Sequence, residues 1–301
     1  MKRIIILAVM VCMCIVLGGC SRAGADSSGF EEKEKLSVVT TIYPMEDFVK
    51  QIGQDKVEII NLVPAGMEPH DFELSTKDMG LLETADVLVY NGSGMEHFID
   101  KTIQTMTNES VIIVEASKDV EQITSEDGKT DPHTWLSIEN AKVECEAICD
   151  ALCKADSENE TFYKDNLKAY EEKLDALYDE FKEGLKDCKK DTIVVAHEAF
   201  GYLCHEFSLN QEGIEGLMAD SEPDSGRMKE IIELCKEEDI KVIFFEELVS
   251  PKVAQTIAAE TGATTMVLNP IEGLTKEQEE NNLDYIGLMK ENLEALKVAL
   301  Q

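Results

Sequence analysis

The chain has 301 residues, of which 61 are acidic and 28 are lysine or arginine, and its formal net charge is −33. Such an acidic surface disfavours nucleic acid and anionic membranes as partners, while it favours solubility and attracts cations. The length is sufficient for two lobes of ordinary domain size.

Residues 1–19 are predicted to be an export signal. Lys2 and Arg3 precede an apolar run, Ile4 to Leu17, which is shorter than the roughly 20 residues that a membrane-spanning helix needs. The run ends in small residues and Cys20, a pattern that resembles a lipobox. This resemblance implies cleavage before Cys20 and a lipid on its sulfur; an ordinary signal with an incidental cysteine is the alternative.

Residues 20–35 are small, polar and charged, without an apolar period. Segments of this composition do not bury enough apolar surface to fold, so we expect a flexible tether behind the lipid anchor. The mature protein would then be held at the outer face of the bacterial cytoplasmic membrane.

From residue 36 onward, short apolar runs alternate with stretches of helical period. Strands and helices that alternate at this spacing predict a mostly parallel α/β sheet. In the first half we expect strands at 36–43, 57–63, 87–91 and 111–115, and helices at 44–52, 75–85 and 95–106.

The stretch from Ser137 to Cys188 is almost wholly helical in composition, with a break near 154–159. Its second part carries apolar and aromatic residues at helical spacing and would span roughly 40 Å as a helix. A helix of this length between two α/β halves predicts a rigid connector. A coiled-coil dimer is the alternative, but too few clean heptads are present.

The second half repeats the α/β pattern. We therefore expect an N-terminal lobe at 36–157, a connecting helix at 158–189 and a C-terminal lobe at 190–301. In the C-terminal lobe we expect strands at 192–196, 241–246 and 264–269, and helices at 197–205, 227–238, 251–261 and 283–300.

Six cysteines remain after the signal and the anchor. Cys145, Cys149 and Cys153 lie four residues apart, on one stripe of a helix. They could bind a soft metal, but burial in the core is the favoured interpretation because free cysteine is among the most buried residue types. Cysteines at this spacing are poorly placed for mutual disulfides, and we assign no bridge among them or to Cys188, Cys204 and Cys235.

Two loops carry a histidine directly after a proline, namely Pro69-His70 and Pro132-His133. Proline stiffens such loops, which can therefore hold an imidazole in one orientation. A single histidine in a loop is usually solvated or structural. The repetition, in a chain with five histidines, favours a functional role.

His197 also follows an apolar strand, and Glu272 follows a strand and a proline. In open α/β sheets, ligands bind beyond the carboxyl ends of the strands, so these side chains and the two loop histidines could converge between the halves. Three imidazoles and one carboxylate suit Zn²⁺.

The motifs around these four residues resemble those of the solute-binding lipoproteins of the zinc/manganese ABC-transporter family, which include high-affinity zinc and adhesin-type binding proteins. The resemblance covers essentially the whole chain. It implies two lobes joined by one long helix, with a metal held between them and handed to a membrane permease. It rests on Gly-Met-Glu-Pro-His-Asp-Phe-Glu around His70, Asp-Pro-His-Thr-Trp-Leu around His133, Ala-His-Glu-Ala-Phe-Gly-Tyr-Leu around His197, Asn-Pro-Ile-Glu-Gly-Leu around Glu272, and the closing segment from Asp284 to Leu296.

Two features bear on the metal. Many zinc members carry a long His-rich loop before the second ligand, whereas here the stretch from Glu115 to Thr130 is short, acidic and without histidine. We therefore expect no metal-collecting role for it. Manganese members commonly have carboxylates at the third and fourth positions, so His197 at the third favours Zn²⁺. Three-histidine manganese binders also occur, and Mn²⁺ is the alternative.

A metallohydrolase would need an open water position and a general base. Gly201 stands four residues after His197, so the segment is not a zincin helix. Four protein ligands suit binding and release, and we expect a monomeric transport protein rather than an enzyme. An adhesive surface lipoprotein is a further alternative, but adhesion does not require three convergent histidines.

Several nearby residues are weaker candidates. Either Glu246 or Glu247 could support the site, since both end a strand at the same edge. We expect Glu198 to be solvent-exposed, His97 and His205 to be structural, and Trp135 to pack the wall of the cleft.

Overall fold

A computed structural model describes residues 34–124, 128–217, 223 and 225–301. The predicted signal, the lipobox with Cys20 and almost all of the predicted tether lie outside the described residues. Residues 34–301 form one compact unit. Within the described ranges, no helix has both the length and the apolar character that a membrane span requires.

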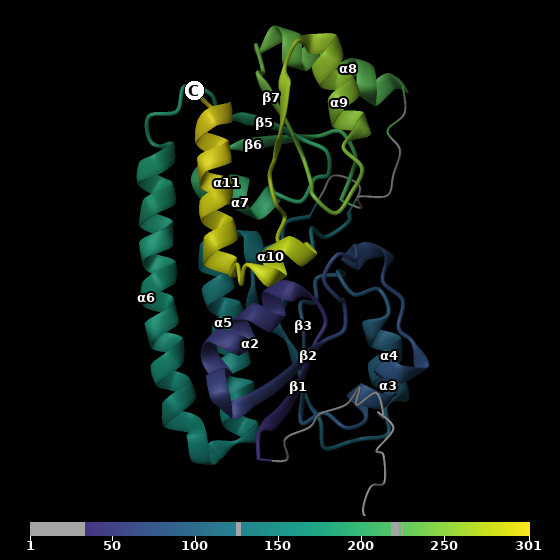
Figure 1. Cartoon of the computed structure of the whole chain (residues 1–301), viewed down its shortest axis with the longest axis vertical. Coiled ribbons are helices and arrows are strands. Elements are labelled where there is room, and N and C mark those ends of the chain that lie inside the picture. The colour runs from purple at the N-terminus through teal and green to yellow at the C-terminus, as the bar shows by residue number, and fades with distance from the viewer. Residues whose placement is uncertain (1–33, 125–127, 218–222, 224) are drawn as a thin grey trace, which may run out of the picture. The chain divides into compact units, whose positions relative to one another are not determined.

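Two four-stranded sheets, each wholly parallel, form the centres of two lobes (Figure 1). The strand order is β2-β1-β3-β4 in the N-terminal lobe and β6-β5-β7-β8 in the C-terminal lobe, so the two sheets share one topology. This confirms the expected α/β fold. The strands are β1 (Leu36–Thr40), β2 (Val57–Asn61), β3 (Val87–Tyr90), β4 (Ile112–Glu115), β5 (Thr192–Val195), β6 (Asn210–Gly213), β7 (Val242–Phe245) and β8 (Thr264–Val267).

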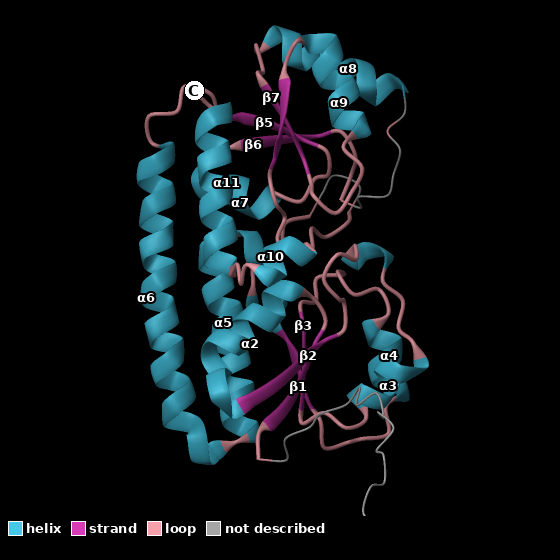
Figure 2. Ribbon diagram, viewed as in Figure 1, coloured by secondary structure: helices cyan, strands magenta, loops and turns pink. Residues whose placement is uncertain are grey.

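The central strands are buried because helices cover the sheets. In β1 and β3, Val38, Val39 and Leu88 are fully buried, as expected for β-branched and aliphatic residues in parallel strands. The helices α2 (Tyr43–Gly53) and α5 (Ile138–Ala155) pack against the first sheet, and α3 (Thr76–Leu82) and α4 (Ile99–Thr105) lie on its other side (Figure 2).

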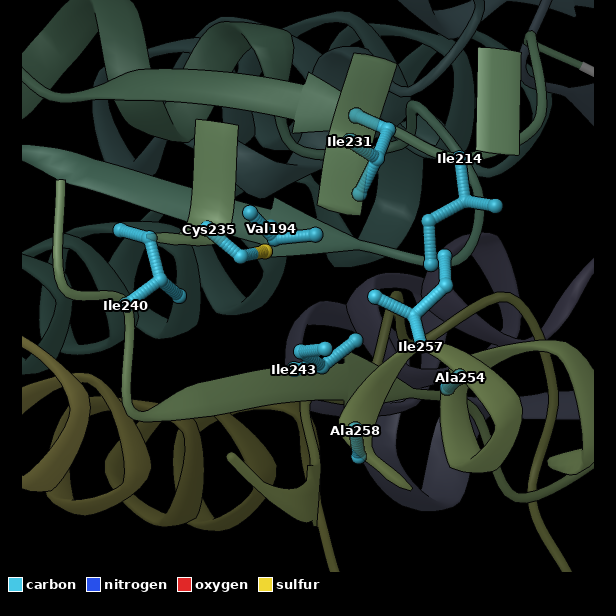
Figure 3. Packing of buried hydrophobic residues seen from close by; sticks show 9 residues of the cluster. All are labelled: Val194, Ile214, Ile231, Cys235, Ile240, Ile243, Ala254, Ile257 and Ala258. Atoms are coloured by element: carbon cyan, nitrogen blue, oxygen red, sulfur yellow. The ribbon is translucent and has the colours of Figure 1, made fainter. Parts of the chain in front are cut away.

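The core of the C-terminal lobe lies between its central strands and the helices α8 (Ser225–Glu237) and α9 (Lys252–Thr261). Figure 3 shows the aliphatic side chains of both helices directed toward β5 and β7. The buried members of this cluster are Val194, Ile214, Ile231, Cys235, Ile240, Ile243, Ala254, Ile257 and Ala258.

The predicted long helix is α6 (Glu160–Leu185), which a short 3₁₀ turn (Ser157–Asn159) separates from α5. Its 26 residues span about 39 Å, and it runs beside both lobes (Figure 1). It packs on α2 and α5 in the first lobe, and on α7 (Gly201–Phe207) and α11 (Tyr285–Ala299) in the second. The lobe boundaries proposed above remain a prediction.

Several elements differ from the expectation, among them α7, which spans Gly201–Phe207 instead of 197–205. The polar strand β6 was not predicted, because Asn-Gln-Glu-Gly lacks the β-branched residues that mark strands; it is an edge strand that pairs only with β5. The short helix α10 (Lys276–Glu280) was also missed. Helix α4 is shorter than the predicted 95–106.

The cysteine stripe packs in the core, as expected. Cys145 and Cys149 are buried in α5, and Cys153 is half-buried near its end. The six described cysteines are all free thiols.

One carboxyl group in α5 is deeply buried. Glu144 is fully buried, and neither of its carboxylate oxygens has a hydrogen-bond partner among the described residues. Burial raises the pKa of Glu144 from 4.5 to about 8. The folded chain therefore holds this proton more tightly than the unfolded chain does.

This makes stability depend on pH with a defined sign. The contribution of Glu144 is fully present below pH 4.5 and is lost as the pH rises through about 8. Glu144→Gln cannot ionise and does not lose this contribution. The difference in the free energy of unfolding between Glu144→Gln and the wild type should therefore increase, in favour of the variant, as the pH rises from 4.5 to about 8. We expect a gain of a few kcal/mol, because a tenfold change in proton affinity is worth about 1.4 kcal/mol.

Urea unfolding of the two proteins between pH 5 and pH 9 measures this gain. Glu146→Gln, at an exposed position of the same helix, is the control and should show no such trend. A difference between Glu144→Gln and wild type that does not change with pH would contradict the assignment.

Candidate metal centre

The structure brings together all four residues that the sequence singled out. His70, His133, His197 and Glu272 are buried, and one ligand atom of each lies within 4.8 Å of the others. Each side chain follows the carboxyl end of a strand, after β2, β4, β5 and β8 in turn. Each lobe therefore contributes two members of the cluster.

His70 is held by a stiff turn. Pro69 opens the 3₁₀ helix Pro69–Asp71, and Glu68 caps it, accepting a hydrogen bond from the His70 backbone N–H at 3.1 Å. Nearby, the Gly66 N–H donates to the carbonyl of Leu274 at 2.7 Å. The loop that carries His70 is thus bonded directly to the loop that carries the carboxylate of the other lobe.

His133 is oriented by Asp131. The Oδ1 atom of Asp131 lies 2.7 Å from His133 Nδ1 and accepts from the His133 backbone N–H at 3.0 Å. The Nε2 atom then faces the cluster, 3.4 Å from His70 Nε2 and 3.0 Å from Glu272 Oε1. A carboxylate that accepts from one ring nitrogen leaves the other free to bind a metal.

The carboxylate of Asp131 is itself confined by the C-terminal lobe. A Cβ atom on Gly201 would lie 2.4 Å from Asp131 Oδ2, so only glycine fits there without displacing the carboxylate. Tyr202 Oη donates to the Asp131 carbonyl at 3.2 Å. Asp131 and Gly201 were not singled out from the sequence, although both stand inside the quoted motifs.

His197 is oriented by Glu246. Its Nδ1 lies 2.9 Å from Glu246 Oε1, and its Nε2 lies 3.0 Å from the carbonyl of Leu217. Burial alone would lower the pKa of His197, but the charge of Glu246 and the hydrogen bond to it raise the pKa to about 10. Of the two candidate supports, Glu246 therefore holds the ring, and Glu247 is exposed.

Glu272 lies at the centre of the cluster and is 1% exposed. Its Oε1 lies 3.0 Å from His133 Nε2, 3.6 Å from His70 Nε2 and 4.0 Å from His197 Nδ1. Burial raises the pKa of Glu272. The interactions with His70, His133 and His197 outweigh burial and hold the pKa well below its usual value. Apart from the imidazoles, neither carboxylate oxygen has a hydrogen-bond partner within the described part of the chain, and His70 Nδ1 has none.

A buried carboxylate whose only hydrogen-bond partners are imidazoles is costly, and a bound cation would reduce that cost. Three imidazole nitrogens and one carboxylate oxygen match the tetrahedral N/O set that Zn²⁺ prefers. The donor set therefore fits a zinc ion.

The remaining candidates lie outside the cluster. His97 and His205 are exposed, and Glu198 is half-buried rather than exposed as expected. Trp135 is fully buried, with its ring 5.5 Å from that of His133. Its Nε1 donates to the Pro270 carbonyl at 2.8 Å, so it packs between the loops of two ligands.

The sequence profile of the family described as zinc-uptake complex component A, periplasmic (ZnuA), matches residues 38–299. The high-affinity zinc uptake system protein ZnuA of Bacillus subtilis is 37% identical over 300 residues, which cover 95% of this chain and 94% of that protein. The zinc-binding lipoprotein AdcA of Streptococcus pneumoniae is 35% identical over 311 residues; these cover 99% of this chain but only 61% of that longer protein.

Solved structures give the same result. The Zn(II)-bound ZnuA-like domain of AdcA from Streptococcus pneumoniae superposes with a TM-score of 0.79 at 37% identity, covering 88% of this chain and 99% of that domain. Lmb of Streptococcus agalactiae, a laminin-binding protein described as both adhesin and metal transporter, superposes with a TM-score of 0.82 at 32% identity, covering 88% of this chain and all of Lmb.

These similarities extend over almost the whole folded part of the chain and confirm the resemblance that its motifs indicated. The family consists of solute-binding components of uptake systems and not of enzymes. The chain belongs to the ZnuA family of zinc-uptake proteins.

Proposed function

We propose that this chain is the extracytoplasmic zinc-binding component of an ABC importer, which captures Zn²⁺ between its lobes and delivers it to a membrane permease. The observation that carries this proposal is the convergence of His70, His133, His197 and Glu272 in one buried cluster. Four protein ligands would complete a tetrahedral shell and leave no open position for a reactive water. Such a shell suits capture and release.

The donor set favours Zn²⁺ over Mn²⁺. Imidazole nitrogen suits Zn²⁺, whereas carboxylate and carbonyl oxygens suit Mn²⁺, and three of the four donors are imidazoles. Asp131 and Glu246 would keep two of the rings in place before the ion arrives, because each lies within hydrogen-bond distance of a ring nitrogen.

The proposal includes the way the protein is held at the membrane. Cys20 would carry the lipid, residues 20–35 would form the tether, and the chain would act as a monomer at the outer face of the cytoplasmic membrane. The lipobox pattern supports the anchor, as does the naming of the relative AdcA as a lipoprotein. The two lobes and connecting helix (36–157, 190–301 and 158–189) would form the receptor that the permease meets.

Zinc binding is tested by thermal unfolding of residues 21–301 after the metal has been removed with a chelator. A ligand that binds only the native state at 1,000 times its dissociation constant adds about 4 kcal/mol to stability. We expect a large rise in melting temperature with Zn²⁺, a smaller one with Mn²⁺, and loss of the zinc effect in His133→Ala.

His205→Ala is the matched control, since His205 is exposed on α7, and it should keep the full rise. A larger effect of Mn²⁺ would overturn the choice of metal. If neither ion raised the melting temperature, the proposed function would be wrong.

Zinc affinity should also increase with pH. The metal binds neutral imidazole, and His197 holds a proton at neutral pH in the metal-free protein, because its pKa is raised to about 10. Binding therefore releases at least one proton, and the affinity should fall about tenfold for each pH unit below neutrality. Competition with a fluorescent chelator, corrected for the chelator's own protonation, measures this slope, and an affinity that did not change with pH would contradict histidine ligation.

Lipidation at Cys20 is tested by labelling growing cells with radioactive palmitate and isolating the protein. The wild type should carry the label, and Cys20→Ser should not. Cys188→Ser, at a half-buried free thiol, should stay labelled. An unlabelled wild-type protein would show that the cysteine at the end of the signal is incidental.

A further inference from the structure

Asn91 lies at the carboxyl end of β3, the strand between β1 and β4 in the N-terminal sheet. None of the four proposed ligands follows β3, yet Asn91 is fully buried at this edge. Both its backbone and its side chain form hydrogen bonds, and two of the side-chain bonds reach the turn that carries His133. Asn91 therefore connects an interior strand to a ligand on a neighbouring loop.

His133 is the central residue of a tight turn. The Thr134 N–H donates to the carbonyl of Pro132 at 2.9 Å. The backbone angles of His133, φ −83° and ψ 47°, are close to those of an inverse γ-turn. The direction in which the imidazole leaves the backbone therefore depends on the place and orientation of this three-residue turn.

The side chain of Asn91 bonds both ends of the turn. Its Nδ2 donates to the Pro132 carbonyl at 2.8 Å, and its Oδ1 accepts from the Thr134 hydroxyl at 3.0 Å. Because the carbonyl can only accept, the amide nitrogen must lie on that side and the amide oxygen must face the hydroxyl. Asn91 thus holds the residue before His133 and the residue after it at the same time.

The backbone of Asn91 is itself fixed in the N-terminal lobe. Its N–H donates to Glu96 Oε1 at 2.8 Å, and its carbonyl accepts from the Ser117 hydroxyl at 2.7 Å and from the Ser117 N–H at 3.0 Å. The Glu96 carboxylate is almost fully buried and also accepts from the hydroxyl of Thr41, directly after β1. A buried network in which every group is bonded is rigid, so Asn91 is a firm attachment point.

The other bonds to this loop have different effects. Asp131 sets the rotation of the His133 ring, but it belongs to the same loop and moves with it. Tyr202 holds the carbonyl of Asp131 from the C-terminal lobe. Asn91 instead attaches the turn to the N-terminal sheet, which also carries the loop of His70. The bonds of Asn91 therefore act on the position of His133 relative to His70.

This relative position matches what a zinc ion requires. The Nε2 atoms of His70 and His133 lie 3.4 Å apart. Two nitrogen ligands at about 2.0–2.1 Å from Zn²⁺ in a tetrahedral shell lie about 3.3 Å from each other. The two imidazoles therefore have the spacing of zinc ligands already in the metal-free protein.

We propose that Asn91 is a positioning residue for metal binding, which fixes the turn of His133 to the N-terminal sheet and so sets the spacing between His133 and His70. The inference rests on the proposed function and adds to it the group that prepares two of the ligands. Ligands that already stand at the right spacing lose less freedom when the ion binds, so the affinity is higher. Asn91 itself does not bind the ion.

Four variants test the two bonds separately. Asn91→Asp keeps the shape of the side chain and the acceptor for Thr134, but it has no N–H for the Pro132 carbonyl. Thr134→Val keeps the branched shape and removes the hydroxyl that bonds Asn91, whereas Thr134→Ser retains the hydroxyl. Asn166→Asp is the matched control, because Asn166 Nδ2 donates to the Ile52 carbonyl, a bond between α6 and α2 that involves neither ligand loop.

Zinc affinity is measured by competition with a fluorescent chelator, on the full-length chain in detergent. Loss of an outer contact of a metal-binding histidine typically weakens metal binding by about 10- to 100-fold. We expect a loss in this range for Asn91→Asp and a loss of about tenfold for Thr134→Val. Thr134→Ser and Asn166→Asp should stay within about twofold of the wild-type dissociation constant.

A second measurement distinguishes positioning from a purely structural role. Co²⁺ absorbs visible light much more strongly in a tetrahedral shell than in an octahedral one, so its spectrum at saturation reports the arrangement of the ligands. Misplacement of His133 should lower this absorption in Asn91→Asp and in Thr134→Val. If Asn91 served stability alone, its replacement would destabilise the metal-free protein and leave the cobalt spectrum unchanged, as we expect for Asn166→Asp.

The outcomes separate this inference from the proposed function. Weaker zinc binding together with lower cobalt absorption would support it. Wild-type affinity in Asn91→Asp, or weaker affinity with an unchanged spectrum, would overturn the role of Asn91 and leave the zinc-binding function in place. If Asn91→Asp does not fold, Thr134→Val compared with Thr134→Ser decides by the same criteria. Failure of the wild type to bind zinc would instead refute the proposed function itself.

Discussion

The structure depends on one buried negative charge. Glu272 holds a carboxylate in the interior, where a charge is expensive unless nearby groups offset it. Only the surrounding imidazoles offset it in the metal-free protein, and two of these rings are fixed by the carboxylates of Asp131 and Glu246. The result is a buried carboxylate with ring nitrogens at short range, a set of donors that suits a divalent cation. Most other features near the site serve to keep these groups in place.

The ligands come from both lobes, and direct contacts fix the position of one lobe against the other. The indole of Trp135 donates to the Pro270 carbonyl, Gly66 donates to Leu274, and Gly201 leaves room for the Asp131 carboxylate. Because the long helix α6 packs on elements of both lobes, a wide hinge opening would break many of these contacts together. We infer that release of the ion needs local rearrangement of the loops that bear the ligands.

Much of this arrangement could be predicted from the sequence, for physical reasons. Apolar strands, helical periods and prolines before His70 and His133 are local signals, and the carboxyl ends of parallel strands meet at one edge. The convergence of four such positions therefore followed from topology. The role of Gly201 was missed because it depends on a contact between the lobes. The role of Asp131 was missed although it is local, because the sequence does not show where a loop carboxylate points. Strand β6 escaped detection because its polar residues form a strand only beside β5.

The packing of α6 has a consequence for how the protein unfolds. Its buried face, which includes Tyr163, Tyr170 and Phe181, is covered by helices of both lobes. Loss of either lobe would expose part of this apolar face to water. We therefore expect that neither lobe is stable without the other. The folded part should behave as one cooperative unit, and an ion held at the centre would then protect amide protons from hydrogen exchange as far away as the far end of α5.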